Sequence, residues 1–200
     1  LSACAPPPEA PPDYAALFPK ERIQRFELSM GTEAWLSLLT DGESYVPAEL
    51  WIGERQFEEV GLRILGDVTA RKPNLRIRFD AFRPGESLRG VKRINLRAPE
   101  DDPSGIREVA ACELMRGAGI AAPRAALAQV WLDGDGPGLY SLVEQVDRKF
   151  LEDRFGENDG SLVKLEPGGA LRDEGEELNV TAYEFKGDEA EPDPEGLLDL

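Results

Sequence analysis

The sequence contains no histidine, and it has only two cysteines and two methionines among its 200 residues. Without histidine, a Ser-His-Asp or Cys-His nucleophile and a His-ligated zinc site are excluded. Two cysteines cannot supply a four-cysteine metal site, and Cys112 stands in an apolar helical pattern that predicts a small buried residue. No stretch approaches the roughly 20 apolar residues that a membrane-spanning helix needs.

Positive charge is also scarce, because 23 Lys and Arg residues stand against 39 Asp and Glu residues, for a formal net charge of −16. Residues 152–200 carry −12 of this charge, which leaves −4 for residues 1–151. This balance argues against a nucleic-acid-binding protein, which would need a basic face. The acidic tail is interpreted as a solvated, mobile segment, and binding to a cationic partner is the alternative.

The amino-terminal residues resemble a bacterial lipobox. Leu1-Ser2-Ala3-Cys4 is followed by a proline-rich stretch, and polyproline is a stiff, extended spacer. We therefore expect Cys4 to carry diacylglycerol and residues 1–13 to form the lipobox and tether of an extracytoplasmic lipoprotein, attached to the membrane in the cell envelope. The charged and apolar regions of a signal peptide would then precede the given sequence. A chance match of four residues is the alternative.

Apolar periodicity predicts a folded domain over residues 14–166. Alternating or short apolar runs bounded by Gly and Pro predict strands at 23–28, 45–52, 60–66, 75–79, 91–96, 126–132, 139–143 and 162–165. Helical spacing predicts helices over 32–39, from the capping residues 102–104 to 117–119, and over 147–155. The close spacing of the strands favours an antiparallel meander. Residues 167–200 are predicted to be acidic and poorly ordered, leading into a truncated second lobe.

Six blocks of sequence, in order, resemble the CotH (spore coat protein H) family of kinase-like proteins. They are Val60–Gly66, Lys72–Phe79, Gly90–Leu96, Asp102–Glu108, Gly117–Arg124 and Gly138–Asp147. The resemblance covers about residues 45–165. It implies an α+β fold, namely an atypical protein-kinase-like amino-terminal lobe made of an antiparallel sheet plus one long helix, with the second lobe largely absent from this chain.

The resemblance also implies binding of ATP with Mg²⁺ and phosphorylation of Ser or Thr in a protein substrate. Lys72 would hold the nucleotide phosphates, with Arg71 as its rival for this role. Glu108 would pair with Lys72 and orient it, and Glu144 would lie near the adenosine at the junction of the lobes. The structural alternatives are a solvated Lys72, a surface ion pair for Glu108, and a backbone contact or helix cap for Glu144.

The sequence departs from the family pattern in two respects. Gly66-Asp67-Val68-Thr69-Ala70 stands where the family often has a serine-rich loop, and the family's N-x-D…H-N and P-W-D-x-D blocks do not occur. A kinase needs such carboxylates to hold metal and accept the substrate proton. We therefore assign no catalytic residue. The chain is expected to be an incomplete part of a CotH-like atypical protein kinase, inactive alone, that acts on coat or envelope proteins. The alternative is a non-catalytic, kinase-like envelope lipoprotein that binds such proteins.

Overall fold

The computed structural model describes residues 11–157, 162–165 and 183–186. Contacts divide the chain into two compact units, Leu1–Gln145 and Val146–Leu200. Cys4 lies outside the described residues, as does most of the segment 167–200. Within the described part of the chain, no helix is long and apolar enough to cross a membrane.

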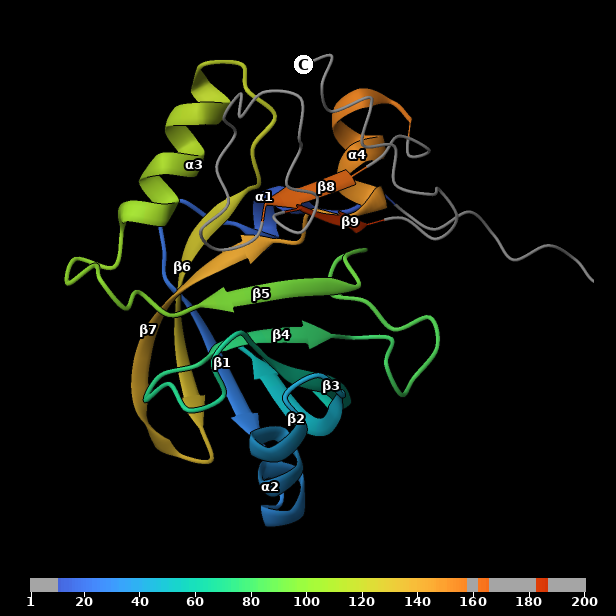
Figure 1. Cartoon of the computed structure of the whole chain (residues 1–200), viewed down its shortest axis with the longest axis vertical. Helices are drawn as coiled ribbons and strands as arrows, with labels where there is room; N and C mark the ends of the chain where they lie inside the picture. Colours follow the sequence, from blue (N-terminus) through green and yellow to red (C-terminus); the bar gives the residue numbers. More distant parts are fainter. Residues whose placement is uncertain (1–10, 158–161, 166–182, 187–200) are drawn as a thin grey trace, which may run out of the picture. The chain divides into compact units, whose positions relative to one another are not determined.

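The first unit is built from seven strands that close into a barrel (Figure 1). Around the barrel the strand order is β1-β2-β3-β4-β5-β7-β6. The strands are β1 (Gln24–Ser29), β2 (Val46–Ile52), β3 (Arg55–Leu65), β4 (Asn74–Arg78), β5 (Arg93–Arg97), β6 (Ala125–Leu132) and β7 (Asp135–Glu144). Each of these lies at or within a few residues of a strand that the apolar alternation predicts.

Three helices accompany the barrel, namely α1 (Tyr14–Leu17), α2 (Thr32–Asp41) and α3 (Arg107–Gly117). Helix α3 lies beside β6 (Figure 1) and buries only Cys112 among its residues. The residue at the N-cap of α3 is Ile106, which makes no side-chain capping hydrogen bond, but the Asp102 carboxylate accepts a hydrogen bond from the backbone N–H of Arg107, the first residue of the helix. Cys112 is a free, buried thiol, as its apolar context predicts.

The predicted fold class is wrong. An α+β kinase-like lobe with one long helix was expected, whereas the unit is mostly a closed seven-stranded barrel whose longest helix has 11 residues. The physical reason is the pairing of β1 with β6, which runs parallel from Gln24↔Ala128 to Leu28↔Leu132. This pairing joins segments about a hundred residues apart, and no local pattern reports it. The antiparallel meander is observed for β2 through β5.

The barrel closure is reinforced by one side chain at the turn between β6 and β7. Asp133 adopts a positive φ of 49°. Its carboxylate accepts hydrogen bonds from the Ser29 hydroxyl at 3.1 Å, from the Met30 backbone N–H at 2.8 Å and from the Trp35 indole N–H. These contacts connect the β6–β7 turn to the end of β1 and to α2.

The core fills the interior of the barrel, and along β4 its residues alternate with less buried ones. Leu75 and Ile77 of β4 are completely buried, and Phe57 packs against Phe79 with ring centroids 4.9 Å apart. Successive side chains of a strand point to opposite faces. The residues between the core residues therefore lie on the outer side of the barrel, and Arg76 of β4 is one of them.

The second unit contains α4 (Arg148–Phe155), β8 (Leu162–Leu165) and β9 (Tyr183–Lys186). Asp147 caps α4 by accepting hydrogen bonds from the backbone N–H groups of Lys149 and Phe150, as the sequence predicts. Strand β9 pairs antiparallel with β8, so a strand lies within the segment that was predicted to lack regular structure.

Candidate functional site

Lys72 lies in the segment before β4, at the rim of the barrel. Its ammonium group donates a hydrogen bond to the carbonyl oxygen of Leu139 and lies 4.5 Å from the ring centroid of Tyr140. Gly138 makes room for it, because a Cβ at that position would lie 3.3 Å from Lys72 Cε. Partial burial lowers the pKa of Lys72. The side chain is therefore occupied by contacts to β7.

Glu108 lies on α3, against the outer side of the barrel. Its carboxylate is 3.4 Å from Arg97 Nε and is hydrogen-bonded to Ser141. Burial raises the pKa of Glu108, and Arg97 and Ser141 oppose this rise. Glu108 is thus a half-buried carboxylate that joins α3 to β5 and β7.

Glu144 ends β7 and forms a buried ion pair with Arg124. One carboxylate oxygen is 2.6 Å from the Arg124 guanidinium, and the other accepts a hydrogen bond from the Arg124 backbone N–H at 2.9 Å. The guanidinium also lies 3.5 Å from the ring centroid of Tyr14. Only 5% of the Glu144 side chain is exposed. This arrangement ties the end of β7 to the start of β6.

The structure does not bring the three predicted site residues together. Tyr140, which Lys72 covers, faces the core, whereas the next residue, Ser141, faces α3 and Glu108. Glu144 is four residues beyond Tyr140, or about 13 Å along an extended strand. Lys72 and Glu108 therefore form no ion pair among the described residues. Nucleotide binding by any of the three remains a prediction.

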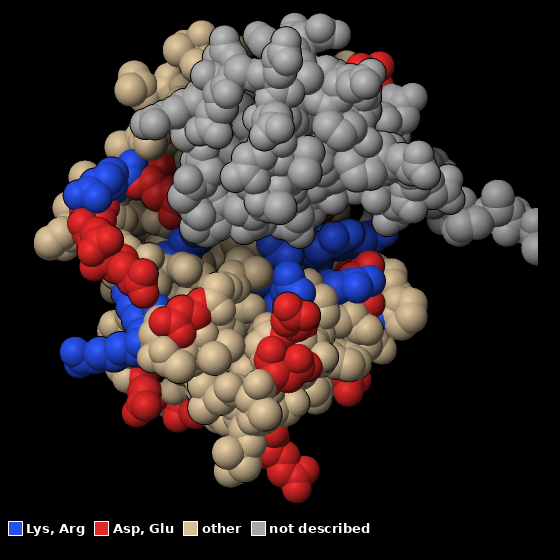
Figure 2. Space-filling model, in the orientation of Figure 1, with Lys and Arg blue, Asp and Glu red and all other residues tan. Residues whose placement is uncertain are grey.

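Sequence reasoning missed a cluster of arginines on the outer side of three adjacent strands. We call it the arginine face, and it consists of Arg63 on β3, Arg76 and Arg78 on β4, and Arg93 on β5. In the orientation of Figure 1, Lys and Arg side chains gather over β4 and β5 (Figure 2). The strand register sets Arg63 directly opposite Arg76 and Arg78 directly opposite Arg93.

Neutral polar groups hold Arg76 at the centre of the arginine face. Its Nε donates a hydrogen bond to Asn95 Oδ1 at 3.0 Å, and its side chain also hydrogen-bonds to Tyr45. Asn95 in turn donates to Gln145 Oε1 at 3.0 Å. This network fixes the direction of the Arg76 side chain without neutralising its charge.

Tyr45 lies among the arginines, with its ring centroid 5.4 Å from the Arg63 guanidinium carbon and 5.9 Å from that of Arg78. Gly61 lets the ring approach the sheet, because a Cβ at Gly61 would be 3.0 Å from Tyr45 Cδ1. Arg78 also donates to Asp80 at 2.7 Å. The face therefore has one aromatic platform and an acidic residue at its edge.

The electrostatics of the arginine face are unbalanced at its centre. Burial lowers the pKa of Arg76, and the charges of Arg63 and Arg93 lower it further, while Tyr45 opposes the shift. Within the described part of the chain, neither Arg63 nor Arg76 has a carboxylate partner. Arg63 Nε is buried and has no hydrogen-bond partner among these residues.

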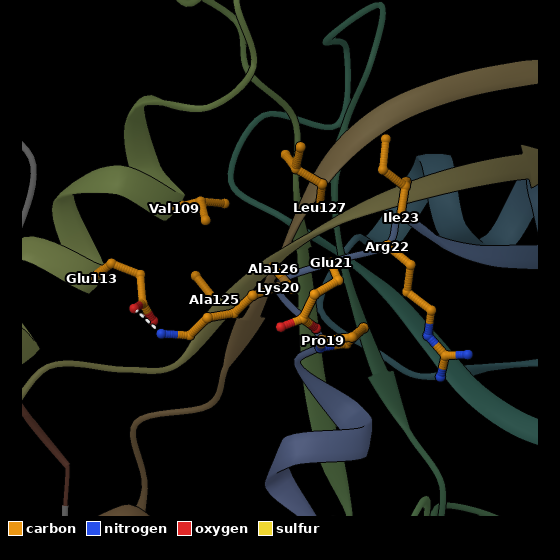
Figure 3. Close-up of a pocket in the computed structure, with 10 residues that line it drawn as sticks. All are labelled: Pro19, Lys20, Glu21, Arg22, Ile23, Val109, Glu113, Ala125, Ala126 and Leu127. Atoms are coloured by element: carbon orange, nitrogen blue, oxygen red, sulfur yellow. Dashed lines mark hydrogen bonds and ion pairs between the residues drawn. The ribbon is translucent and has the colours of Figure 1, made fainter.

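A separate pocket of about 370 Å³ lies beside α3, on the side of the helix that carries Val109 and Glu113 (Figure 3). It is lined by Val109 and Glu113 of α3, by residues 125–127 of β6 and by residues 19–23. An ion pair between Lys20 and Glu113 borders it. The pocket shares no residue with the arginine face, and its walls are mainly aliphatic.

A metal site built by the protein alone needs several oxygen or thiolate ligands close together. Among residues 11–157, 162–165 and 183–186, no group of three or more Asp, Glu or Cys side chains could hold a metal ion. Mg²⁺ is usually bound by one or two carboxylates together with substrate phosphates, so binding of Mg²⁺ with ATP stays a prediction.

The signal for the arginine face was present in the sequence. Leu75-Arg76-Ile77-Arg78 alternates cleanly, and this alternation already places both arginines opposite the core. What the sequence alone could not supply was the register that adds Arg63 and Arg93 to the same face.

Fold and site together define a β-barrel domain with a basic outer sheet face beside a short helix. The chain belongs to the CotH kinase protein family, because the sequence model of that family matches residues 62–197, more than half of the chain. This match confirms the resemblance seen in the six blocks, and it contains the whole arginine face. No curated protein matches the chain.

Proposed function

We propose that this protein acts as a CotH-type atypical protein kinase that uses ATP to phosphorylate Ser or Thr in coat or envelope proteins, with the barrel as its nucleotide-binding part. The observation that carries this proposal is the arrangement of α3. Glu108 of α3 is turned by Arg97 toward the same outer side of the sheet that bears the arginine face. A positively charged sheet face beside an oriented carboxylate suits an anionic cosubstrate such as ATP.

ATP carries three linked phosphoryl groups, and residues of the protein would bind and orient them. In this proposal Arg97 and Ser141 hold Glu108 at the border of the sheet face. Glu108 is a positioning residue and makes no direct contact with the transferred group. No catalytic step is assigned to a described residue.

The test compares two carboxylates of α3 in the protein as its gene encodes it. Glu108→Gln should lower the turnover of ATP-dependent phosphorylation about ten- to hundredfold, because misplaced groups cost rates of this order. Its KM for ATP should change less than its kcat. Glu113→Gln, on another flank of the same helix, should leave both constants near the wild-type values.

The assay uses radiolabelled ATP with Mg²⁺ and an extract of envelope or coat proteins as substrate. Loss of turnover confined to Glu108→Gln supports the proposal. Equal losses in both variants would show a general effect on α3. A wild-type protein that binds no ATP and labels no protein would favour the non-catalytic scaffold, which binds coat or envelope proteins without chemistry.

A further inference from the structure

We propose that the outer side of strands β2, β1 and β6 binds a chain of neutral sugars. The site consists of Trp51 on β2, Arg25 and Glu27 on β1, and Trp131 on β6, and we call it the tryptophan face. These three adjacent strands are not those of the arginine face (Figure 1). The proposal therefore does not rest on the proposed kinase function.

The strand register sets two of the three tryptophans of the chain in one row. Glu27 lies directly opposite Trp51 on one side and directly opposite Trp131 on the other. The residue before each of these three is buried in the core, namely Phe26, Leu50 and Val130. Side chains alternate along a strand, so the row lies on the outer side of the barrel. Two strand spacings separate the tryptophans by roughly 10 Å. A single sugar ring is narrower than this row, whereas a chain of linked sugars spans it.

Trp51 offers an open aromatic surface. The residue is 38% exposed, and within the described part of the chain its side chain has no hydrogen bond, ion pair or ring contact. A tryptophan ring is a large apolar surface with one polar N–H group, and leaving it in water costs free energy. The C–H groups on one face of a sugar ring can pack against it, and the indole N–H can donate to a sugar oxygen.

Arg25 and Glu27 supply hydrogen-bonding groups beside this surface. Arg25 Nε lies 2.7 Å from Glu27 Oε1, and the two side chains are 55% and 44% exposed. A guanidinium has five N–H donors and a carboxylate has two acceptor oxygens, so both groups keep donors and acceptors for a ligand. Neighbouring sugar hydroxyls each donate and accept, which suits such a pair. The Arg25 guanidinium carbon also lies 4.2 Å from the ring centroid of Trp131, which makes Trp131 a positioning residue for Arg25.

The charges of the tryptophan face select a neutral ligand. Arg25 and Glu27 neutralise each other, and Glu49 at the edge of the face accepts a hydrogen bond from Gln56. An anionic ligand would meet two carboxylates beside one guanidinium. A cationic ligand would compete with Arg25 for the ring of Trp131. An aromatic surface with a few convergent polar groups and no excess charge suits an uncharged, hydroxyl-rich molecule.

The experiment is native electrophoresis of the full-length protein through gels that contain hydroxyethyl cellulose, mannan or glycol chitin, which are soluble neutral polysaccharides. Retardation of wild-type protein by at least one of them is expected. Trp51→Ala should weaken this binding about tenfold, because a stacked ring is lost. The matched control is Phe82→Ala, which removes another exposed aromatic residue, in the loop between β4 and β5, and should change the affinity less than twofold.

The polar half of the site has its own control. Arg25→Gln should weaken binding about three- to tenfold, because hydrogen bonds to the sugar are lost. Arg83→Gln breaks another exposed ion pair, that with Glu58, and should leave the affinity near the wild-type value. Trp131→Leu should weaken binding only where Arg25 is present, so the double variant should bind as Arg25→Gln does. Trp131→Phe keeps a ring under Arg25 and should restore most of the affinity.

Tryptophan fluorescence identifies the occupant of the face. Titration with a polysaccharide that retards the protein should change the emission of wild type, and this change should be lost in Trp51→Phe. The proposal is overturned if no neutral polysaccharide retards the wild type, or if Phe82→Ala loses as much affinity as Trp51→Ala. A Trp51-dependent change in emission with deglycosylated envelope proteins, and with none of the polysaccharides, would also overturn it and assign the face to a protein partner.

Discussion

The two sides of strand β4 have opposite roles. Leu75 and Ile77 are completely buried in the barrel, whereas Arg76 and Arg78 alternate with them on the outer side. The inner residues gain stability by leaving water. On the outer side Arg76 lies directly opposite Arg63, and like charges in such positions cost stability, whereas Arg78 is paired with Asp80. One short strand therefore combines a stabilising side with a side suited to binding.

The same contrast appears between the ionic groups of the first unit. Glu144 and Arg124 form a close, buried pair at 2.6 Å, so each neutralises the other. Arg76 is held by Asn95 and Tyr45, which are neutral. The paired charges tie β7 to the start of β6, whereas Arg76 has no carboxylate partner within the described part of the chain.

The largest effect is expected on the inner side of β4. Ile77→Ala should lower the free energy of unfolding by about 2–5 kcal/mol, since it removes buried methyl groups and leaves a cavity. Arg78→Gln, at a partly exposed position, should change it by less than about 1 kcal/mol. Urea unfolding followed by circular dichroism measures both. Comparable losses in the two variants would contradict the separation of roles between the two sides.

The buried ion pair should give the next largest effect. Glu144→Ala should destabilise the protein by about 3 kcal/mol, because the Arg124 charge is then left in the interior without its partner. Since Arg124→Ala breaks the same contact, the double variant should lose clearly less than the two single losses combined. A double-mutant cycle by urea unfolding measures this coupling. Strict additivity would show that the two residues act independently.

Much of the local structure could be predicted from the sequence. The alternation in Leu75–Phe79 and the Asp147 cap of α4 are local signals, and both correspond to observed elements. The family was also identified from short sequence motifs, and the match over residues 62–197 confirms it. These features depend on neighbouring residues alone, so one sequence is sufficient to detect them.

The barrel closure and the arginine face were not predicted, because both depend on contacts between distant segments. The register of β1 on β6 joins Gln24 to Ala128, and the register of β4 on β5 sets Arg78 opposite Arg93. Net charge was a poor guide for the same reason. A total of −16 suggested that no basic face exists, whereas the fold gathers four arginines on adjoining strands.

The smallest expected effect compares two carboxylates on α3 whose pKa values move in opposite directions. Burial raises the pKa of Glu108 above its usual value of 4.5. The hydrogen bond from Lys20 lowers the pKa of Glu113 below that value. Substituting each by glutamine removes one titration and leaves the size of the side chain nearly unchanged.

The sign of each pH dependence follows from proton binding in the folded and unfolded states. The folded protein holds the Glu108 proton more tightly, so wild-type stability falls as pH rises from 4.5 through the raised pKa. Glu108→Gln should therefore gain stability relative to wild type over that window. Glu113 contributes stability above 4.5 that is lost as pH falls through its lowered pKa. Glu113→Gln should then be less stable than wild type at neutral pH and equal to it in acid.

Urea unfolding at several pH values between about 3 and 7 measures both differences. If the stability of the two variants relative to wild type changed with pH in the same way, the opposite pKa shifts of Glu108 and Glu113 would be contradicted.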